Sequence, residues 1–120
     1  MALEIQRSAP LTTEIRGSKG HAVVVLAGEL DASTAGGLYE ALATLNREGV
    51  VHVALDLRAL EFIDSTGISV IIAEHKRTAS ANGELIILTP HHNVRRLFEV
   101  AGLMDVLDVL PREATGGINP

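Results

Sequence analysis

The 120-residue sequence contains no cysteine, 47% hydrophobic residues and a formal net charge of −5. This length suits one domain with its own core, and the lack of cysteine excludes a disulfide framework, a Cys zinc site and thiol catalysis. No dense Lys/Arg cluster supports direct nucleic-acid binding, and without a long apolar run or a signal peptide we expect a cytoplasmic protein with no membrane insertion.

The first half of the chain predicts strands followed by a helix. Residues 3–15 are assigned to an early strand or pair of strands, and residues 17–20 to a turn. The apolar, β-branched run 21–28 is typical of a buried strand. Residues 31–34 carry the side chains of a helix N-cap, and leucines then recur at helical spacing until Gly49, which predicts the end of this helix.

The second half repeats this alternation. The run 50–57 predicts a second buried strand, and residues 64–67 open a second helix that ends at residues 82–83. Residues 85–88 predict a third strand, after which helix signals resume near Asn93. Each of the apolar strands at 21–28, 50–57 and 85–88 is therefore followed by a predicted helix.

The last helix is predicted to bury one apolar stripe, made of Val94, Leu97, Phe98 and Ala101. Gly102 is expected at its C′ position, with Leu103 in the hydrophobic contact that often follows such a glycine. Residues 104–110 are predicted to form a short final strand, and residues 112–120 are expected to form a frayed tail.

Strands that alternate with helices predict βαβ units. We therefore expect an α/β fold: a single-layer mixed, mostly parallel sheet with right-handed βαβ crossovers and helices packed on it. No internal repeat or linker divides the chain, so residues 1–120 are expected to form a single domain. Because only 2% of the residues are aromatic, the core must consist of aliphatic side chains.

The segment most suggestive of chemistry is Asp64-Ser65-Thr66-Gly67, between a predicted strand and a predicted helix. Ordinary helix capping by Asp64 or Ser65 explains such a segment in most proteins. The functional alternative is that Ser65 accepts a phosphate, which would add roughly −1.5 to −2 charges at a helix start that tolerates an anion. The residues alone leave both interpretations open.

The segment 62–68, Phe-Ile-Asp-Ser-Thr-Gly-Ile, resembles the signature of STAS domains, and specifically of bacterial anti-sigma factor antagonists. Two further segments resemble the family in the same order: Gly-Glu-Leu-Asp at 28–31 followed by Thr-Ala at 34–35, and the last helix at 94–103. One departure is Ser69, where the family often has glycine. This side chain offers a second hydroxyl and leaves the choice of partner open.

The resemblance implies a regulatory switch rather than an enzyme. The unphosphorylated protein would bind an anti-sigma factor that is also a serine kinase, and binding would release a sigma factor. The kinase, with its own ATP and magnesium, would phosphorylate Ser65, and a PPM-type phosphatase would remove the phosphate. No cofactor is implied for the chain itself. The implied partner-binding residues are Asp31, Asp64, Thr66, Gly67, Ile68 and Ser69.

Two of these residues also have structural explanations. Asp31 is expected both to cap the first helix and to lie near Ser65, because their loops follow adjacent strands and meet at one end of the sheet. Ile68 suits either the core or the centre of an interface. Modification of Thr66 or Ser69 in addition to Ser65 stays open.

Other functions receive less support from the sequence. A STAS scaffold or an accessory subunit of a transport system would keep the domain but change its biology. A hydrolase with Ser65 as its nucleophile lacks the G-x-S-x-G elbow that exposes such a serine. The five histidines show no metal-binding spacing, and no glycine-rich nucleotide motif is present.

Overall fold

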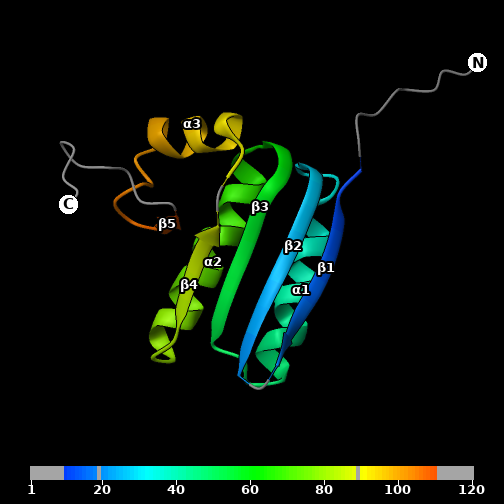
Figure 1. Cartoon of the computed structure of the whole chain (residues 1–120), viewed down its shortest axis with the longest axis vertical. Coiled ribbons are helices and arrows are strands. Elements are labelled where there is room, and N and C mark those ends of the chain that lie inside the picture. Colours follow the sequence, from blue (N-terminus) through cyan, green and yellow to red (C-terminus); the bar gives the residue numbers. More distant parts are fainter. Residues whose placement is uncertain (1–9, 19, 89, 111–120) are drawn as a thin grey trace, which may run out of the picture.

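Strands and helices alternate along the chain as the sequence predicts (Figure 1). The computed structural model describes residues 10–18, 20–88 and 90–110. In chain order its elements are β1 (Thr12–Ser18), β2 (His21–Leu30), α1 (Ala35–Arg47), β3 (His52–Ile63), α2 (Ser65–Ser80), β4 (Glu84–Leu88), α3 (His92–Val100) and β5 (Asp108–Leu110).

The strands form one sheet in the order β1-β2-β3-β4-β5. β1 pairs with β2 in antiparallel fashion, and every later pair is parallel. The prediction of a single mixed, mostly parallel sheet with βαβ crossovers is therefore confirmed. Parallel pairing brings the carboxyl ends of β2 and β3 together at one edge of the sheet, where α/β proteins commonly place their sites.

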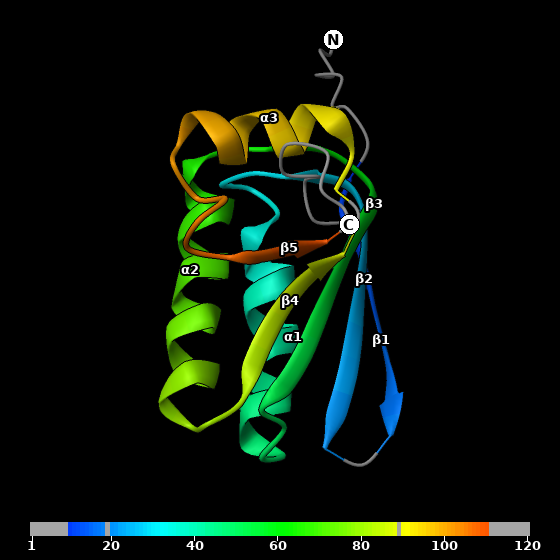
Figure 2. The same cartoon turned by 60° about the vertical axis from the view of Figure 1, so that its left-hand side comes forward.

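The helices cover one face of the sheet and one of its ends. α1 and α2 stand side by side against the sheet, while α3 lies across the end where β3 finishes (Figures 1 and 2). Alternate residues of β2 point toward α1 and α2 and are buried, as period-two strands require. The core is aliphatic apart from Phe98, because the other two aromatic side chains are exposed.

The ends of two helices show the predicted glycine chemistry. Gly102 has φ of 74°, and the N–H of Leu103 donates to the carbonyl of Phe98 at 2.8 Å. The same arrangement recurs at Gly49, where φ is 75°. These are Schellman caps, in which a left-handed residue lets the chain satisfy the last carbonyls of a helix. Both predicted helix ends are confirmed.

The predicted length of the central strand was wrong. β3 extends to Ile63, beyond the predicted end at residue 57. Beyond Leu57 the buried positions are spaced by three, at Leu60 and Ile63, and the β2–β3 register shifts at two places. A strand with such bulges loses the period-two pattern on which the prediction depends.

The predictions for the two ends of the chain were also partly wrong. β1 is Thr12–Ser18 rather than residues 3–15, and residues 1–9 lie outside the described part. β5 is Asp108–Leu110, shorter than the segment predicted within 104–110, because residues 104–106 form a turn. The predicted tail at 112–120 also lies outside the described residues.

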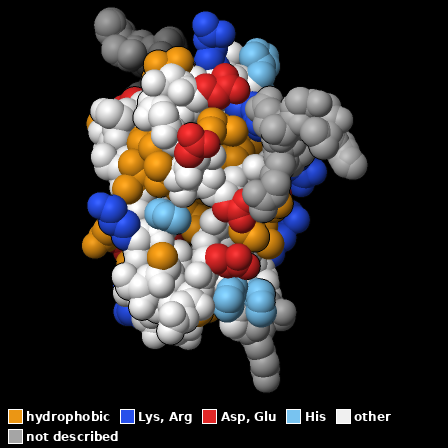
Figure 3. Space-filling model, turned by 90° about the vertical axis from the view of Figure 1, so that its left-hand side faces the viewer, with side chains coloured by type: hydrophobic (Ala, Val, Ile, Leu, Met, Phe, Trp, Pro, Cys, Tyr) orange, Lys and Arg blue, Asp and Glu red, His pale blue; other side chains and the backbone are white. Residues whose placement is uncertain are grey.

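α3 buries a narrower stripe than predicted. Val94 and Phe98 are fully buried, but Leu97 is 38% exposed and Ala101 is exposed beyond the end of the helix. Leu97, Val100 and Val106 are exposed apolar residues of α3 and the turn after it, and hydrophobic side chains gather among acidic ones on this side of the molecule (Figure 3). A nine-residue helix that rests on the end of the sheet touches the core with only one narrow face.

Within the residues that the structure describes, no helix is long and apolar enough to cross a membrane.

Candidate functional site

Two loops meet at the carboxyl ends of β2 and β3, and Asp64 joins them. The backbone N–H of Asp64 donates to the carbonyl of Leu30 at 3.1 Å. In the other direction, Oδ2 of Asp64 accepts from the N–H of Ala32 at 3.2 Å. The loop after β2 and the start of α2 therefore form one surface, as the parallel order of the strands led us to expect.

Asp64, and not Ser65, is the N-cap of α2. Its Oδ1 accepts from the N–H groups of Thr66 at 2.9 Å and of Gly67 at 3.1 Å. A carboxylate here also interacts favourably with the positive end of the helix. Because Asp64 does the capping, the hydroxyl of Ser65 is not used for it.

Ser65 is the first residue of α2 and is exposed. Among the described residues, none forms a hydrogen bond with its hydroxyl. The neighbouring Ser69 differs, since its Oγ donates to the carbonyl of Ser65 at 2.9 Å. Such a bond to the residue four positions earlier holds the second hydroxyl against its own helix. Of the two serines, Ser65 presents the freer hydroxyl.

Asp31 organises the loop before α1. Its Oδ1 accepts from the hydroxyl of Ser33 at 2.7 Å, and from the N–H groups of Ser33 at 2.9 Å and Thr34 at 3.2 Å. The Ser33 hydroxyl is the main cause that lowers the pKa of Asp31, and the N–H groups add to it. Asp31 therefore places a carboxylate charge near the loop junction at neutral pH.

Asp31 does not cap α1 in the way the sequence predicted. The N-cap is Thr34, and its side chain makes no capping bond. Instead, Oγ1 of Thr34 donates to the carbonyl of Glu29 at 2.8 Å, and the carbonyl of Asp31 accepts from the N–H of Ala35 at 2.8 Å. The side chains of this loop therefore form hydrogen bonds within the turn that precedes α1, and not with the first N–H groups of the helix itself.

The remaining predicted site residues differ in exposure. Thr66 and Ser69 are exposed, and both line a hollow between α1 and α2. Ile68 is half-buried and packs against the core, so only part of it is free for a partner. Gly67 is buried, and a Cβ at this position would come within 2.6 Å of Cγ of Leu30. Gly67 therefore lets α2 approach β2 closely.

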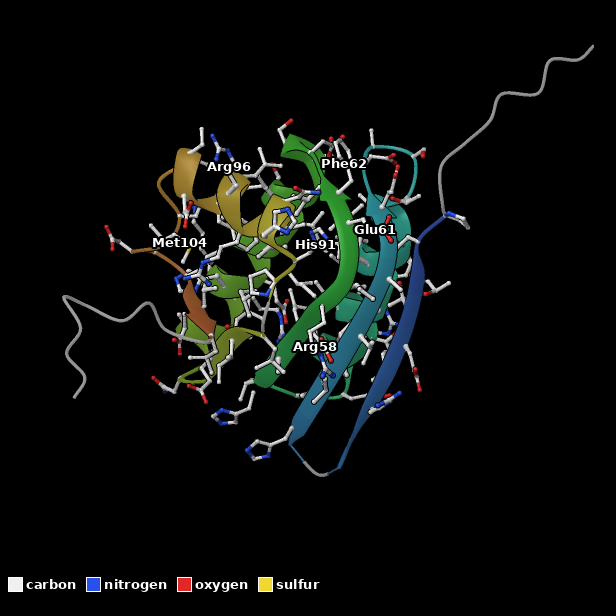
Figure 4. The ribbon with its side chains drawn as sticks, turned by 45° about the horizontal axis from the view of Figure 1, so that its top comes forward. Arg58, Glu61, Phe62, His91, Arg96 and Met104 are labelled. Atoms are coloured by element: carbon white, nitrogen blue, oxygen red, sulfur yellow. The ribbon has the colours of Figure 1, made fainter. Side chains whose placement is uncertain are left out.

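Sequence reasoning did not single out two exposed aromatic residues near this end. Phe62 is 43% exposed at the end of β3, three residues before Ser65, and Figure 4 shows it at the same end of the molecule as Arg96 of α3. Tyr39 of α1 is 61% exposed. In a chain with three aromatic residues, an aromatic side chain inside the serine motif was the available signal for Phe62.

No group of three or more His, Asp or Glu side chains in residues 10–18, 20–88 and 90–110 is arranged to hold a metal ion. Four of the five histidines instead form two stacked pairs. The ring centroids of His21 and His52 lie 4.9 Å apart, and those of His91 and His92 lie 4.6 Å apart. At Ser65 the structure shows an exposed hydroxyl next to the Asp64 cap, on a surface that also includes the loop of Asp31.

The comparison with known families agrees with this geometry. The family model for the STAS domain matches residues 12–116. The chain belongs to the STAS domain family. Over 90 residues it is 34% identical to the anti-sigma-B factor antagonist of Listeria monocytogenes, covering 74% of this chain and 78% of that protein. This STAS protein is therefore placed among the anti-sigma factor antagonists.

Solved structures show the same architecture. An anti-sigma factor antagonist from Mycobacterium paratuberculosis superimposes with a TM-score of 0.75 at 26% identity, over 84% of this chain and 86% of that one. The phosphorylated form of the Bacillus cell fate determinant SpoIIAA has the same fold, with a TM-score of 0.67 at 21% identity over 82% and 90% of the two chains. The relatives are regulatory antagonists rather than enzymes, which supports the same assignment for this STAS protein.

Proposed function

We propose that this STAS protein, in its unphosphorylated form, binds an anti-sigma factor and thereby releases a sigma factor. The anti-sigma factor is also a serine kinase that phosphorylates Ser65, which abolishes binding, and a PPM-type phosphatase restores the unphosphorylated form. Residues 1–120 act as one domain in the cytoplasm, where transcription takes place. The single observation that carries this proposal is the exposed Ser65 hydroxyl at the start of α2.

The geometry around Ser65 supports a charge switch. Asp31 and Asp64 already place two carboxylates at the loop junction. A phosphate would add roughly −1.5 to −2 charges beside them. In a contact from which water has been displaced, such like-charge crowding lowers affinity, and about 1.4 kcal/mol is enough for a tenfold change.

Phosphorylation at this position is compatible with the fold. The hydroxyl of Ser65 holds no described part of the structure together, since Asp64 caps α2. The N-terminus of a helix also favours an anion. SpoIIAA in its phosphorylated form retains this same fold. The switch therefore acts on the surface of the domain and leaves its core unchanged.

The proposal is tested with purified protein and each anti-sigma factor kinase of the source organism, incubated with ATP and magnesium. We expect mass spectrometry to find the phosphate on Ser65. Ser65→Ala should bind the kinase but accept no phosphate, whereas Ser65→Asp should bind at least tenfold more weakly. Ser80→Ala, at an exposed serine in the last turn of α2, is the matched control and should be phosphorylated like the wild type.

Two results would contradict the proposal. One is a phosphate that forms on another residue while Ser65 stays unmodified. The other is a Ser65→Asp variant that binds the kinase as tightly as the wild type does.

A further inference from the structure

A hollow of about 490 Å³ lies between α1 and α2 on the side of these helices that faces away from the sheet. Its lining follows one stripe of each helix: Tyr39, Leu42, Ala43 and Asn46 on α1, and Thr66, Ser69, Val70, Ala73, Glu74 and Arg77 on α2. From Thr66 to Arg77 the stripe runs roughly 16 Å along α2, at about 1.5 Å per residue. We call this hollow the α1–α2 groove.

Small side chains create the groove. Ala43, Ser69 and Ala73 occupy facing positions of two helices that stand side by side (Figure 2). Such side chains are too short to fill the space between the outer surfaces of the helices. Leu42 and Val70 give the groove an apolar floor, and Tyr39 stands at its rim with 61% of its surface exposed. Exposed tyrosines beside an apolar hollow are typical of protein interfaces.

The two ends of the groove differ. At the end away from Ser65, Nη1 of Arg77 donates to Oδ1 of Asn46 at 3.1 Å and bridges the helices. At the other end lie Thr66 and Ser69, and Ser69 is hydrogen-bonded to the backbone of Ser65. The groove therefore continues directly into the surface that carries Ser65.

The area that a stable protein complex buries indicates how far the partner's contact must extend from Ser65. A specific protein complex buries about 800 Å² on each partner, contributed by roughly 20–30 residues. The two loops at the end of the sheet are short, so a protein that binds at Ser65 and buries this area also contacts neighbouring parts of the domain. α3 is one such part, and the groove, which begins at the second residue of α2, is another.

We propose that the anti-sigma factor which binds at Ser65 lays a helical segment into the α1–α2 groove. This inference rests on the proposed function and extends it from one hydroxyl to a second contact region. About three turns of helix match the length of the groove, and apolar side chains at helical spacing match its floor. The groove sets the affinity of the complex, while phosphorylation of Ser65 decides whether the complex forms.

The test places a bulky charge in the groove. Ala73→Arg fills it from an exposed position of α2, and Ala79→Arg adds the same side chain at an exposed position outside the lining. Tyr39→Ala removes the rim without adding bulk. We expect Ala73→Arg to raise both the Kd for the anti-sigma factor and the KM for phosphorylation of Ser65 at least tenfold. Tyr39→Ala should raise both at least threefold. The kcat should stay within twofold, because Ser65 and its cap are unchanged.

Thermal unfolding of every variant verifies the fold, and Ala79→Arg should match the wild type in Kd, KM and kcat. If both groove variants bind and react like the wild type while Ser65→Asp fails to bind, the groove inference is overturned and the proposed function stands. If no anti-sigma factor binds the wild type, both are overturned. Light scattering tests whether a second copy of the chain occupies the groove instead. A wild-type dimer that Ala73→Arg dissociates would assign the groove to that second copy and overturn the inference.

Discussion

At the scale of single residues, the site depends on two neighbours of Ser65 that carry no hydroxyl. Asp64 fixes the start of α2 and holds the loop after β2 through Ala32. Gly67 allows α2 to pack closely on Leu30 and Ile63. One residue supplies hydrogen bonds and the other supplies space, and together they present Ser65 to solvent.

Gly67→Ala should destabilise the domain by about 1–3 kcal/mol, the usual cost of overpacking a core. The added Cβ would lie 2.6 Å from Cγ of Leu30 and 2.9 Å from Cγ1 of Ile63, so α2 would have to move outward. Gly36→Ala is the matched control in α1, where a Cβ meets nothing within 4 Å, and it should stabilise by up to about 1 kcal/mol. Urea unfolding measures both, and a Gly67→Ala variant as stable as the wild type would contradict the packing argument.

At the scale of elements, one arginine connects the C-terminal half of α2 to its neighbours. Arg77 pairs with the buried Glu74 at 2.7 Å and also donates to Asn46 of α1 and to the carbonyl of Val50 before β3. The hydrogen bonds from Arg77 to Glu74 are the main cause that raises the pKa of Arg77. One side chain thus connects α2, α1 and the entry to β3.

Arg77→Met should cost about 3 kcal/mol of unfolding free energy, because it leaves the Glu74 carboxylate buried without its partner. The double variant Glu74→Leu/Arg77→Met should recover most of this loss, since no unpaired charge remains. Arg47→Met on the exposed face of α1 is the control and should change stability by less than about 0.5 kcal/mol. A double variant that is less stable than Arg77→Met would show that packing and not the unpaired charge dominates.

At the scale of the whole molecule, stability should depend on pH through Asp56 in the middle of the sheet. This buried carboxylate accepts from Nε and Nη2 of Arg58 at 3.0 and 2.7 Å and from the Arg58 N–H at 3.1 Å. These bonds lower the pKa of Asp56 from its ordinary value of 3.8, with the Arg58 side chain as the largest cause. A depressed carboxyl pKa stabilises the fold above the unfolded value and ceases to do so as the pH falls through the folded value.

The free energy of unfolding should therefore decline as the pH falls below about 4. Asp56→Asn should be less stable than the wild type at pH 7 and should show a shallower decline in acid. Denaturant titrations between pH 2 and 7 measure this difference. The contributions of Asp31 and Glu14 are the same in both proteins and cancel in the comparison. Parallel curves for the two proteins would contradict the role of Asp56.

Much of this architecture could be predicted from the sequence, because local sequence patterns determine it. Apolar runs indicated the parallel strands, and glycines at 49 and 102 marked helix ends that the φ angles confirm. The far half of β3 was missed because its bulges break the period of two. Leu97 was misplaced because periodicity shows which residues share a face of a helix, and it does not show how much of that face is covered.

The candidate site was predictable only in part. The serine motif and the meeting of two loops followed from the strand order, but the choice of Asp64 as the cap required backbone geometry. The bond between Asp64 and Ala32 joins residues 32 positions apart, and no local pattern encodes it. The α1–α2 groove likewise depends on how two helices face each other. The roles of Ser65 and its neighbours in binding stay predictions.

The order of the strands in the sheet is the same as their order in the chain. Each strand therefore lies next to the strand that leaves the ribosome just before it, and no position has to be kept vacant for a later segment. Loop closure between neighbouring strands stays short, which keeps its entropic cost low. A growing chain can build this sheet from β1 to β4 while α3 is still being synthesised, and β5 then adds the far edge.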